Sequence, residues 1–354
     1  MYYSEDEARK LVIEAGHKLV DSKLIARTWG NISARISEDE FIITPSGRSY
    51  DSLEPSDLVI VRVKDASYEG DVKPSSEKGA HAAVYSLRSD VNFVIHTHQY
   101  YASAVAADCR DTDFAPCAGY GLPGTDKLKK NLEKAIKANP DKREFLMARH
   151  GTIILGKDFD DAFKRASDLE DKCKELVEAR IPSHDFTFIE DFDASEVKIT
   201  ALPFVKVVSD PYILECCKAG ITVRSYIDDF AQIVGPDMQV VDNDAWMAQR
   251  ALLGYSVTKP PKAISNMPMT GVLPRMGGQQ PALNSLIGRN AVLVKGVGAV
   301  CAGKTKSDAE AIAMIVSKNC CAACYARNEK PLSAIDARLQ RYGYLTSYSK
   351  KIEA

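Results

Sequence analysis

The spacing of apolar residues predicts helices mixed with short strands over the first 180 residues. Leu11, Ala15, Leu19 and Val20 recur on one face of residues 5–21, which indicates an amphipathic helix. Further helices are predicted at 74–88, 99–108, 126–140 and 158–180. Short apolar runs predict strands at 30–36, 41–45, 57–63 and 91–98, and a strand pair or hairpin at 144–156. Because these elements follow no regular strand–helix–strand rhythm, a mixed α/β layered fold is favoured over a doubly wound parallel sheet.

A short block of the first half recurs in the second. HGTIILGKDFDDAF at 150–163 resembles VGAVCAGKTKSDAE at 297–310, and each combines a small-residue turn, an apolar strand, Gly-Lys and a long helix. The acidic stretch 181–198, which contains a proline, is the candidate linker between the halves. The repeat predicts a duplicated domain, divided into residues 1–190 and 191–354.

Composition narrows the class of protein. The chain has 354 residues, of which 45% are hydrophobic and 27% charged, as in globular proteins with a substantial core. The net charge of −2 gives no electrostatic argument for binding nucleic acid or an anionic membrane. The charged N-terminus has no signal-peptide pattern, and no apolar run is long enough to span a bilayer. A cytoplasmic protein is predicted.

Nine cysteines are scattered along the chain, and an odd number in a long chain argues against a disulfide framework. Cys320, Cys321 and Cys324 form the cluster CCAAC, which suggests a soft-metal site. The cluster lies in a helical pattern without a second Cys or His pair to complete a tetrahedral shell. Small buried residues are the favoured interpretation.

His96 and His98 are separated by one residue in the predicted strand 91–98. Residues i and i+2 of a strand face the same side, so both imidazoles can reach one ion. His150 follows another apolar run, and Gly151 after it lets the backbone pass close by. Three neutral imidazoles leave an open position for water or substrate, as in a catalytic zinc site. Taken alone, the HxH pair also fits half-buried polar residues at a sheet edge.

Three segments are suited to hold a phosphate. They are WGNIS with Asn31, TPSG with Ser46 and Gly47, and PSSE with Ser75 and Ser76. The serine pair is expected at the start of the helix 74–88, where free amides and the helix dipole attract anions. Each segment alone also fits a turn or a helix cap.

Glu77 follows the serines and is expected in the first turn of that helix. It is either an acid favoured there by the helix dipole, or a metal ligand and general base. His81 lies four residues later on the same face and is interpreted as a packed histidine with hydrogen-bond partners. His17 and His184 are interpreted as surface or packing residues.

Six motifs occur in a characteristic order: GNISAR, ITPSG, KPSSEKGAH, IHTH, PCAGYGLPGTDKL and HGTIILGKDFDDAF. Together they resemble the class II aldolase/adducin family, and its fuculose-phosphate aldolase branch above all. The resemblance covers roughly residues 5–180. It implies a three-layer α/β/α fold around a mainly antiparallel sheet.

The resemblance also implies the roles of the site residues. His96, His98 and His150 would bind Zn²⁺, with Mn²⁺ or Co²⁺ as alternatives. Glu77 would bind the free metal and then act as the base. Asn31, Ser46, Gly47, Ser75 and Ser76 match the family's phosphate-binding positions.

The implied activity is that of a lyase, a metal-dependent aldolase. It would cleave a ketose or deoxyketose 1-phosphate to dihydroxyacetone phosphate and an aldehyde, with the metal polarising the carbonyl. Related sugar-acid phosphate decarboxylases, dehydratases and epimerases share the metal site and are alternatives. Epimerases of the family carry aspartate at the position of Glu77, so glutamate favours carbon–carbon cleavage. An adducin-like interaction module is less favoured, because such modules have usually lost the ligands.

Two departures from the family affect the expectations. The segment 108–120 is short and lacks the tyrosine-bearing insertion of fuculose-phosphate aldolases, so the acid on the aldehyde side is unassigned and Tyr120 is no clear equivalent. In the repeat, Val297 stands where His150 would be, so the second domain is expected to lack the metal site. Because family members form four-fold rings, a homo-oligomer is expected, either a tetramer or a dimer that forms a pseudo-tetramer.

Overall fold

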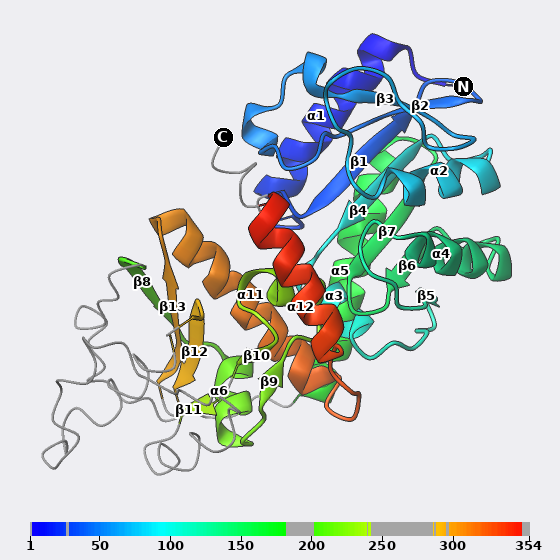
Figure 1. The fold of residues 1–354 in the computed structure, drawn as a ribbon. Coiled ribbons are helices and arrows are strands. Elements are labelled where there is room, and N and C mark those ends of the chain that lie inside the picture. Colours follow the sequence, from blue (N-terminus) through cyan, green and yellow to red (C-terminus); the bar gives the residue numbers. More distant parts are fainter. Residues whose placement is uncertain are drawn as a thin grey trace, which may run out of the picture. The chain divides into compact units, whose positions relative to one another are not determined.

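The computed structural model describes residues 2–25, 28–181, 202–238, 240–241, 286, 288–294 and 297–348 (Figure 1). Contacts divide the chain into two compact units. The first consists of Met1–Ser183, Arg224–Pro236 and Lys318–Ala354, and the second of His184–Val223 and Asp237–Ser317. Every residue of the predicted site therefore belongs to the first unit.

The first helix, α1 (Glu5–Asp21), confirms the predicted amphipathic helix. The Ser4 hydroxyl accepts a hydrogen bond from the backbone N–H of Glu7, which caps the start of the helix. The buried residues of α1 follow steps of three and four positions and include Ala8, Val12, Ala15 and Leu19. This stripe packs α1 against the sheet.

A seven-stranded sheet forms the centre of the first unit, in the order β3-β2-β1-β4-β7-β6-β5. Its strands are β1 (Gly30–Arg35), β2 (Glu40–Ile43), β3 (Val59–Arg62), β4 (Phe93–Thr97), β5 (Cys117–Ala118), β6 (Glu144–Met147) and β7 (Gly151–Gly156). Within the described part of the chain, neighbouring strands are antiparallel except β5 and β6, which are parallel. The expected mainly antiparallel sheet is confirmed, and the sequence pattern misses only the short strand β5.

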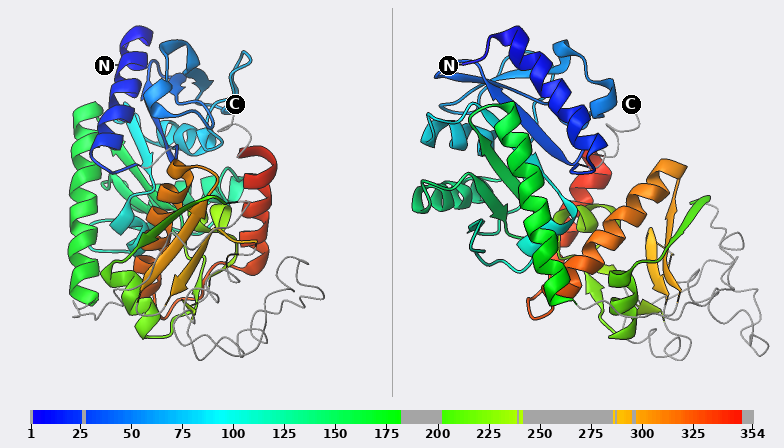
Figure 2. Two further views of the ribbon diagram at one scale, coloured as in Figure 1. Left: turned by 90° about the vertical axis from the view of Figure 1, so that its left-hand side faces the viewer. Right: turned by 180° about the vertical axis from the view of Figure 1, so that it is seen from behind.

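Helices cover both faces of this sheet (Figures 1 and 2). On one face lie α1, α3 (Tyr100–Ala106) and α5 (Phe159–Arg180), and on the other α2 (Lys78–Leu87) and α4 (Asp126–Ala138). Alternate residues of β4 face opposite layers: Val94 joins the apolar core beneath α2 and α4, whereas Phe93 packs against Phe159 of α5. The expected three-layer α/β/α fold is confirmed. His96, two residues after Val94, faces the side of α2.

The helix after the predicted phosphate segments begins later than expected. α2 begins at Lys78, and Glu77 is its N-cap residue rather than a residue of its first turn. The Ser75 N–H donates to the carbonyl of Thr44 at 3.0 Å, so this loop pairs with the chain just beyond β2. Pro74 also forms an antiparallel β-bridge with Pro45, which keeps the chain extended at the predicted start, so the helical turn forms only after the serines. The predicted start at Pro74 and Ser75 is wrong.

The second unit contains a four-stranded sheet in the order β11-β12-β13-β8. Its elements are β8 (Phe204–Val208), α6 (Pro211–Lys218), β10 (Asp237–Met238), β11 (Val240–Val241), β12 (Ala291–Val294) and β13 (Gly298–Gly303). The chain passes between the units within β9 (Val223–Arg224) and α11 (Lys306–Tyr325). The first unit also holds η1 (Tyr50–Ser52), η2 (Pro55–Asp57), α7 (Asp228–Ile233), α12 (Ala334–Gly343) and η4 (Tyr344–Tyr348).

Both copies of the sequence repeat form an antiparallel hairpin followed by a long helix, β6-β7-α5 and β12-β13-α11. Each second strand starts at a glycine that passes close to a neighbouring strand. A Cβ atom added at Gly151 would lie 2.4 Å from the carbonyl oxygen of Thr97. One added at Gly298 would lie 2.4 Å from the carbonyl oxygen of Val208. The likeness covers the hairpin and helix, while duplication of a whole domain and its division at residue 190 stay predictions.

Of the candidate linker 181–198 only Ile181 is described, and His184 also lies outside the described residues. Among the described helices, none combines the length and apolar composition that crossing a bilayer requires. The cytoplasmic location stays a prediction.

All nine cysteines are free thiols, and Cys320, Cys321 and Cys324 are buried in α11, as expected of small buried residues.

Candidate metal centre

The three histidines of the predicted site come from the ends of two neighbouring strands. His96 lies on β4, opposite Ile153 of β7, and His98 follows the end of β4. His150 lies directly before β7, after Arg149, whose positive φ of 60° makes a tight turn. A Cβ atom at Gly151 would lie 2.4 Å from the carbonyl oxygen of Thr97, so only glycine lets the chain pass this closely.

These histidines and Glu77 form one compact cluster. One ligand atom from each of Glu77, His96, His98 and His150 lies within 4.8 Å of the others. The Nε2 atom of His96 is 2.8 Å from Oε2 of Glu77 and 2.9 Å from Nε2 of His98. The Nε2 atom of His150 is 3.2 Å from Oε1 of Glu77. The structure thus brings together all four residues that the sequence proposed as metal ligands.

Each histidine directs its other ring nitrogen away from the cluster. His96 Nδ1 lies 2.7 Å from the carbonyl oxygen of Thr152, and His98 Nδ1 lies 2.6 Å from Oδ1 of Asp229. Because a carbonyl and a carboxylate only accept, these Nδ1 atoms donate. In the neutral rings the Nε2 atoms of His96 and His98 then carry lone pairs that face each other and Glu77.

This arrangement of acceptors fits a bound cation. Two imidazole lone pairs and a carboxylate oxygen repel one another at 2.8–2.9 Å unless a proton or a bound cation lies between them. In addition, Oε1 of Glu77 is buried without a hydrogen-bond partner. A buried acceptor of this kind is costly, and a metal ion would satisfy it. The donor set of three imidazoles and one carboxylate suits a divalent metal.

The ionisable side chains of the cluster shift one another's pKa values. Burial opposes ionisation of Glu77, but His96 and His150 outweigh it and hold the pKa of Glu77 well below its usual value. Burial lowers the pKa of His98 to about 4. Burial lowers the pKa of His150, but the negative charges of Glu77 and Asp228 outweigh this effect and raise the pKa to about 9. Glu77 is therefore an anion at neutral pH.

A buried hydrogen-bond chain orients Glu77. Asn31 Nδ2 donates to Oε2 of Glu77 at 3.2 Å, and Asn31 Oδ1 accepts a short hydrogen bond from His81 Nε2. His81 Nδ1 then accepts from the hydroxyl of Ser33, at 2.6 Å. Burial lowers the pKa of His81 to about 3, so this ring is neutral. The interpretation of His81 as a packed histidine with hydrogen-bond partners is confirmed.

The predicted phosphate segments 44–47 and 73–76 lie side by side. Pro45 and Pro74 form an isolated β-bridge, and the Ser46 N–H donates to the carbonyl of Lys73 at 2.9 Å. The hydroxyl of Ser75 accepts a hydrogen bond from the backbone N–H of Glu77 at 3.2 Å, which ties this loop to the cluster.

The remaining predicted phosphate residues differ in their surroundings. Gly47 has a positive φ of 80°, which glycine adopts without strain, and Ser76 is exposed. The side chain of Asn31 is engaged with Glu77 and His81. Phosphate binding by Asn31, Ser46, Gly47, Ser75 and Ser76 stays a prediction.

Three buried polar side chains that the sequence reasoning did not single out contact the cluster histidines, namely Asp228, Asp229 and Lys318, and a fourth, Gln340, donates to Asp228. They come from α7, α11 and α12, far along the chain from the histidines. A sequence signal for them does exist, because the acids of SYIDDFAQIVG lie within an otherwise apolar run. Two adjacent carboxylates there require buried partners.

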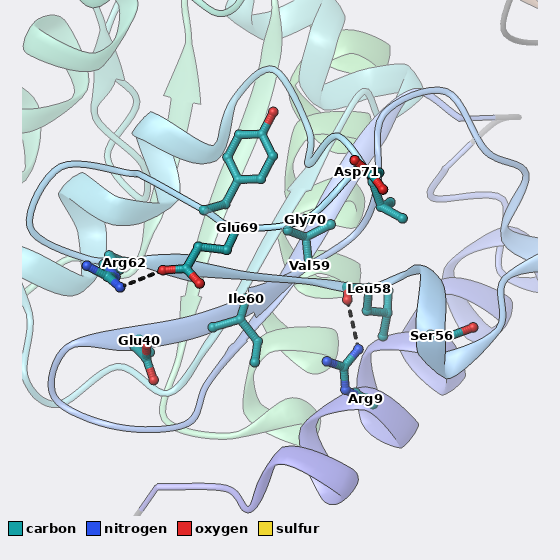
Figure 3. A pocket seen from close by; sticks show the side chains of 12 residues that line it. Arg9, Glu40, Ser56, Leu58, Val59, Ile60, Arg62, Glu69, Gly70 and Asp71 are labelled. Carbon is teal, nitrogen blue, oxygen red and sulfur yellow. Dashed lines mark hydrogen bonds and ion pairs between the residues drawn. The ribbon is translucent and has the colours of Figure 1, made fainter.

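A cavity of about 400 Å³ lies elsewhere, along the edge strand β3 (Figure 3). Its lining includes Arg9 of α1, Arg62 of β3 and the loop residues Glu69 and Asp71. Arg9 donates to the carbonyl of Leu58 at 2.7 Å, and Arg62 pairs with Glu69 at 2.9 Å. None of Glu77, His96, His98 and His150 lines this cavity, so it is not the candidate site.

Comparison with known proteins gives consistent matches to about half of the chain. A family model described as the class II aldolase and adducin N-terminal domain matches residues 10–177. A 5-deoxy-D-ribulose 1-phosphate aldolase from Bacillus thuringiensis is 33% identical over 46% of this chain and 80% of that relative. A 3-oxo-tetronate 4-phosphate decarboxylase from Haemophilus influenzae is 25% identical over 47% of this chain and 85% of that relative. A solved L-fuculose 1-phosphate aldolase is 29% identical, with a TM-score of 0.46, over 51% of this chain and 88% of that structure.

These matches define an enzyme of the lyase class. The chain belongs to the class II aldolase/adducin family. The expected family is thereby confirmed, and the four cluster residues all lie within the matched region. Helices α7, α11 and α12 lie beyond it.

Proposed function

We propose that this chain is a divalent-metal-dependent aldolase. It cleaves a ketose 1-phosphate or deoxyketose 1-phosphate to dihydroxyacetone phosphate and an aldehyde. The observation that carries this proposal is the buried cluster of Glu77, His96, His98 and His150 within the region that matches the family. The relative that is 33% identical is named for such a substrate, 5-deoxy-D-ribulose 1-phosphate.

The histidines would hold the ion through their Nε2 atoms, and Glu77 through a carboxylate oxygen. This donor set favours Zn²⁺, with Mn²⁺ or Co²⁺ as alternatives. A bound divalent ion supplies Lewis-acid polarisation of the substrate carbonyl and neutralises negative charge that develops during cleavage.

Glu77 moves the proton in the proposed reaction. As an anion, it takes the proton from the hydroxyl on C4 of the ketose while the C3–C4 bond breaks. The hydroxyl oxygen becomes the aldehyde carbonyl, and the bonding electron pair stays with C3. Return of the same proton to C3 completes dihydroxyacetone phosphate, so protons and electrons balance. The hydrogen bond from Asn31 keeps Oε2 fixed, and Oε1 is the oxygen without a hydrogen-bond partner.

The loops at 44–47 and 73–76 are the proposed phosphate site. Ser46, Ser75 and Ser76 supply hydroxyls, and Gly47 and Ser76 supply backbone amides, in two loops joined to each other and to Glu77. Asn31 completes the predicted set. Ser75 accepts a hydrogen bond from the N–H of Glu77, which leaves its hydroxyl proton for a second partner. Hydroxyl and amide donors of this kind are typical of phosphate sites.

Decarboxylation of a sugar-acid phosphate is the second candidate function. The relative named 3-oxo-tetronate 4-phosphate decarboxylase, at 25% identity, favours it. Both reactions break a carbon–carbon bond next to a carbonyl and leave a similar carbanion, so the cluster serves either one.

The partners proposed for this chain are the phosphorylated sugar and further copies of the chain. A dimer in which each chain fills two positions of a pseudo-four-fold ring, or a tetramer, follows from the predicted duplication.

A substrate panel tests the proposed function. The purified chain, supplied with Zn²⁺, Mn²⁺ or Co²⁺ in turn, is offered ketose 1-phosphates and sugar-acid phosphates, while dihydroxyacetone phosphate and CO₂ are measured in parallel. The proposal expects dihydroxyacetone phosphate from at least one ketose 1-phosphate. Release of CO₂ alone would favour the decarboxylase, and no turnover with any of these compounds would count against an enzyme of this type.

A further inference from the structure

We propose that Asp229 and Asp228 are positioning residues that hold His98 and His150 for metal binding. They stand on α7, beyond the region that matches the family. Lys318 and Gln340 in turn hold the two carboxylates. This inference rests on the proposed function, because it assumes that the histidines bind a divalent cation.

The contact between Asp229 and His98 is short and buried. Oδ1 of Asp229 lies 2.6 Å from Nδ1 of His98, and the Asp229 side chain is 1% exposed. This bond fixes the Nδ1–H tautomer of His98, so its Nε2 lone pair faces the cluster. A carboxylate bonded to Nδ1 also makes the opposite nitrogen a stronger donor to a metal.

Lys318 compensates the buried charge of Asp229. Its Nζ atom lies 2.6 Å from Oδ2 of Asp229, and its side chain is 4% exposed. The same ammonium donates to the backbone carbonyl of His98 at 3.1 Å. Lys318 therefore binds both the carboxylate of Asp229 and the backbone of His98, the histidine that Asp229 orients. Each oxygen of Asp229 has its own partner, so the carboxylate cannot rotate without losing one.

Asp228 makes the equivalent approach to His150. Its Oδ2 atom lies 3.1 Å from Nδ1 of His150, and both atoms are buried and have no hydrogen-bond partner elsewhere, so they face each other as a longer ion pair than the contact between Asp229 and His98. Its Oδ1 atom accepts from Nε2 of Gln340 at 2.9 Å. The Asp228 N–H also donates to the carbonyl of Arg149 at 3.3 Å, so the start of α7 is attached to the turn that carries His150.

Helix α7 is itself anchored by the last segments of the first unit. Oδ1 of Asn319 accepts from the backbone N–H of Tyr226 at 3.0 Å. The N–H of Leu332 donates to the carbonyl of Ser225 at 3.0 Å. These bonds fix the chain just before the two aspartates, so their carboxylates are placed by a packed structure.

A role in stability alone explains this arrangement poorly. Burying two adjacent carboxylates is costly, and a pair of buried charges stabilises a fold little compared with apolar residues of the same size. Both carboxylates instead face the outward nitrogen of a cluster histidine, the placement typical of residues that support metal ligands.

The affinity of the full chain for Zn²⁺, measured by competition with a chromogenic chelator, tests this inference. Asp229→Asn keeps the shape but removes the charge and should weaken Zn²⁺ binding about 10- to 100-fold. Asp228→Asn, which can still accept from Gln340, tests the second contact independently and should also weaken it. Asp108→Asn is the matched control, because Asp108 is a buried acid of the same unit that pairs with Arg180 rather than with a histidine.

A second readout does not depend on catalysis. The visible absorption spectrum of the Co²⁺-loaded chain should change in Asp229→Asn and Asp228→Asn and stay unchanged in Asp108→Asn, since it reports the geometry of the ligands. Zn²⁺ affinity and Co²⁺ spectra equal to those of the unaltered chain in both aspartate variants would overturn the inference. If His98→Ala abolishes binding while both aspartate variants bind normally, only this inference fails. If the unaltered chain binds no divalent ion, the proposed function fails with it.

Discussion

The two carboxylate oxygens of Glu77 have different surroundings. Oε2 lies 2.8 Å from His96 Nε2 and accepts from Asn31 at 3.2 Å, whereas Oε1 has no hydrogen-bond partner. The low pKa of Glu77, which His96 and His150 maintain against the effect of burial, keeps it ionised at neutral pH. A carboxylate of this kind is ready to accept a proton.

Glu77→Gln should therefore lower turnover by at least ~10²-fold, because the amide has almost the same shape but cannot take the proton. The thermal unfolding curve should show that the fold is retained. Glu14→Gln, at an exposed position of α1, is the control and should keep normal turnover. Near-normal turnover in Glu77→Gln would refute the assigned role.

Ser75→Ala should mainly raise KM for the phosphorylated substrate, by about 10-fold, since one hydrogen bond to an anion is lost. The phosphate is held in the same way throughout the reaction, so kcat should change much less. Steady-state kinetics measures both constants, with the exposed Ser86→Ala of α2 as the control. Equal use of the unphosphorylated sugar by the unaltered chain would contradict a phosphate site.

Single residues near the cluster differ in how far the sequence reveals them. His96 and His98 are separated by one residue, so the two-residue period of a strand suffices to predict that they face one side. Asp228 and Asp229 meet His150 and His98 only through the tertiary fold, because they lie on α7, far from both strands in sequence. Periodicity carries no information about such a contact.

At the level of elements, the short helix α3 depends on a side chain from α5. The carboxylate of Glu170 accepts from the backbone N–H groups of Tyr101 at 2.8 Å and Ala102 at 2.9 Å. These are amides of the first turn of α3, which have no partner within the helix. Because α3 begins just after His98, Glu170 also fixes the chain that leaves the metal cluster.

Glu170→Ala should lower the free energy of unfolding by about 1–3 kcal/mol, since two partly buried amides lose a charged acceptor. Urea unfolding of the full chain measures this loss. Glu175→Ala, at an exposed position of the same helix, should cost much less. Equal stability of the two variants would show that the α3 amides find other partners.

Most elements of the first unit were predictable, because their apolar periods are long and regular. The start of α2 was not, since Ser75 and Ser76 resemble a helix start locally. The β-bridge between Pro45 and Pro74 keeps this stretch extended, and it joins segments distant in sequence. The short strand β5 has too few residues to show a period.

For the whole molecule, the first unit depends on late parts of the chain. Arg149 donates to the carbonyl of Pro331 at 3.2 Å, and Arg180 donates to that of Tyr325 at 2.8 Å. Segments 224–236 and 318–354 thus belong to the unit that holds the metal cluster. The discontinuity could not be read from the sequence, where the acidic stretch at 181–198 marks only one boundary.

A fragment that ends at residue 190 should accordingly be insoluble or inactive. It keeps all four cluster residues but lacks segments 224–236 and 318–354 of the same unit, and it exposes side chains that pack against them, such as Tyr120. Light scattering and metal content of the fragment, compared with the full chain, check this. A soluble, fully active tetramer of the fragment would contradict the expected dependence.

We expect catalysis to require one divalent ion, bound by Glu77, His96, His98 and His150. The most direct measurement is release of dihydroxyacetone phosphate from a ketose 1-phosphate by the chelator-stripped chain, as Zn²⁺ or Mn²⁺ is added back. We expect no release after stripping and full recovery at about one ion per chain, with no recovery in His98→Ala. Equal rates before and after stripping, or the same recovery in His98→Ala as in the unaltered chain, would contradict this expectation.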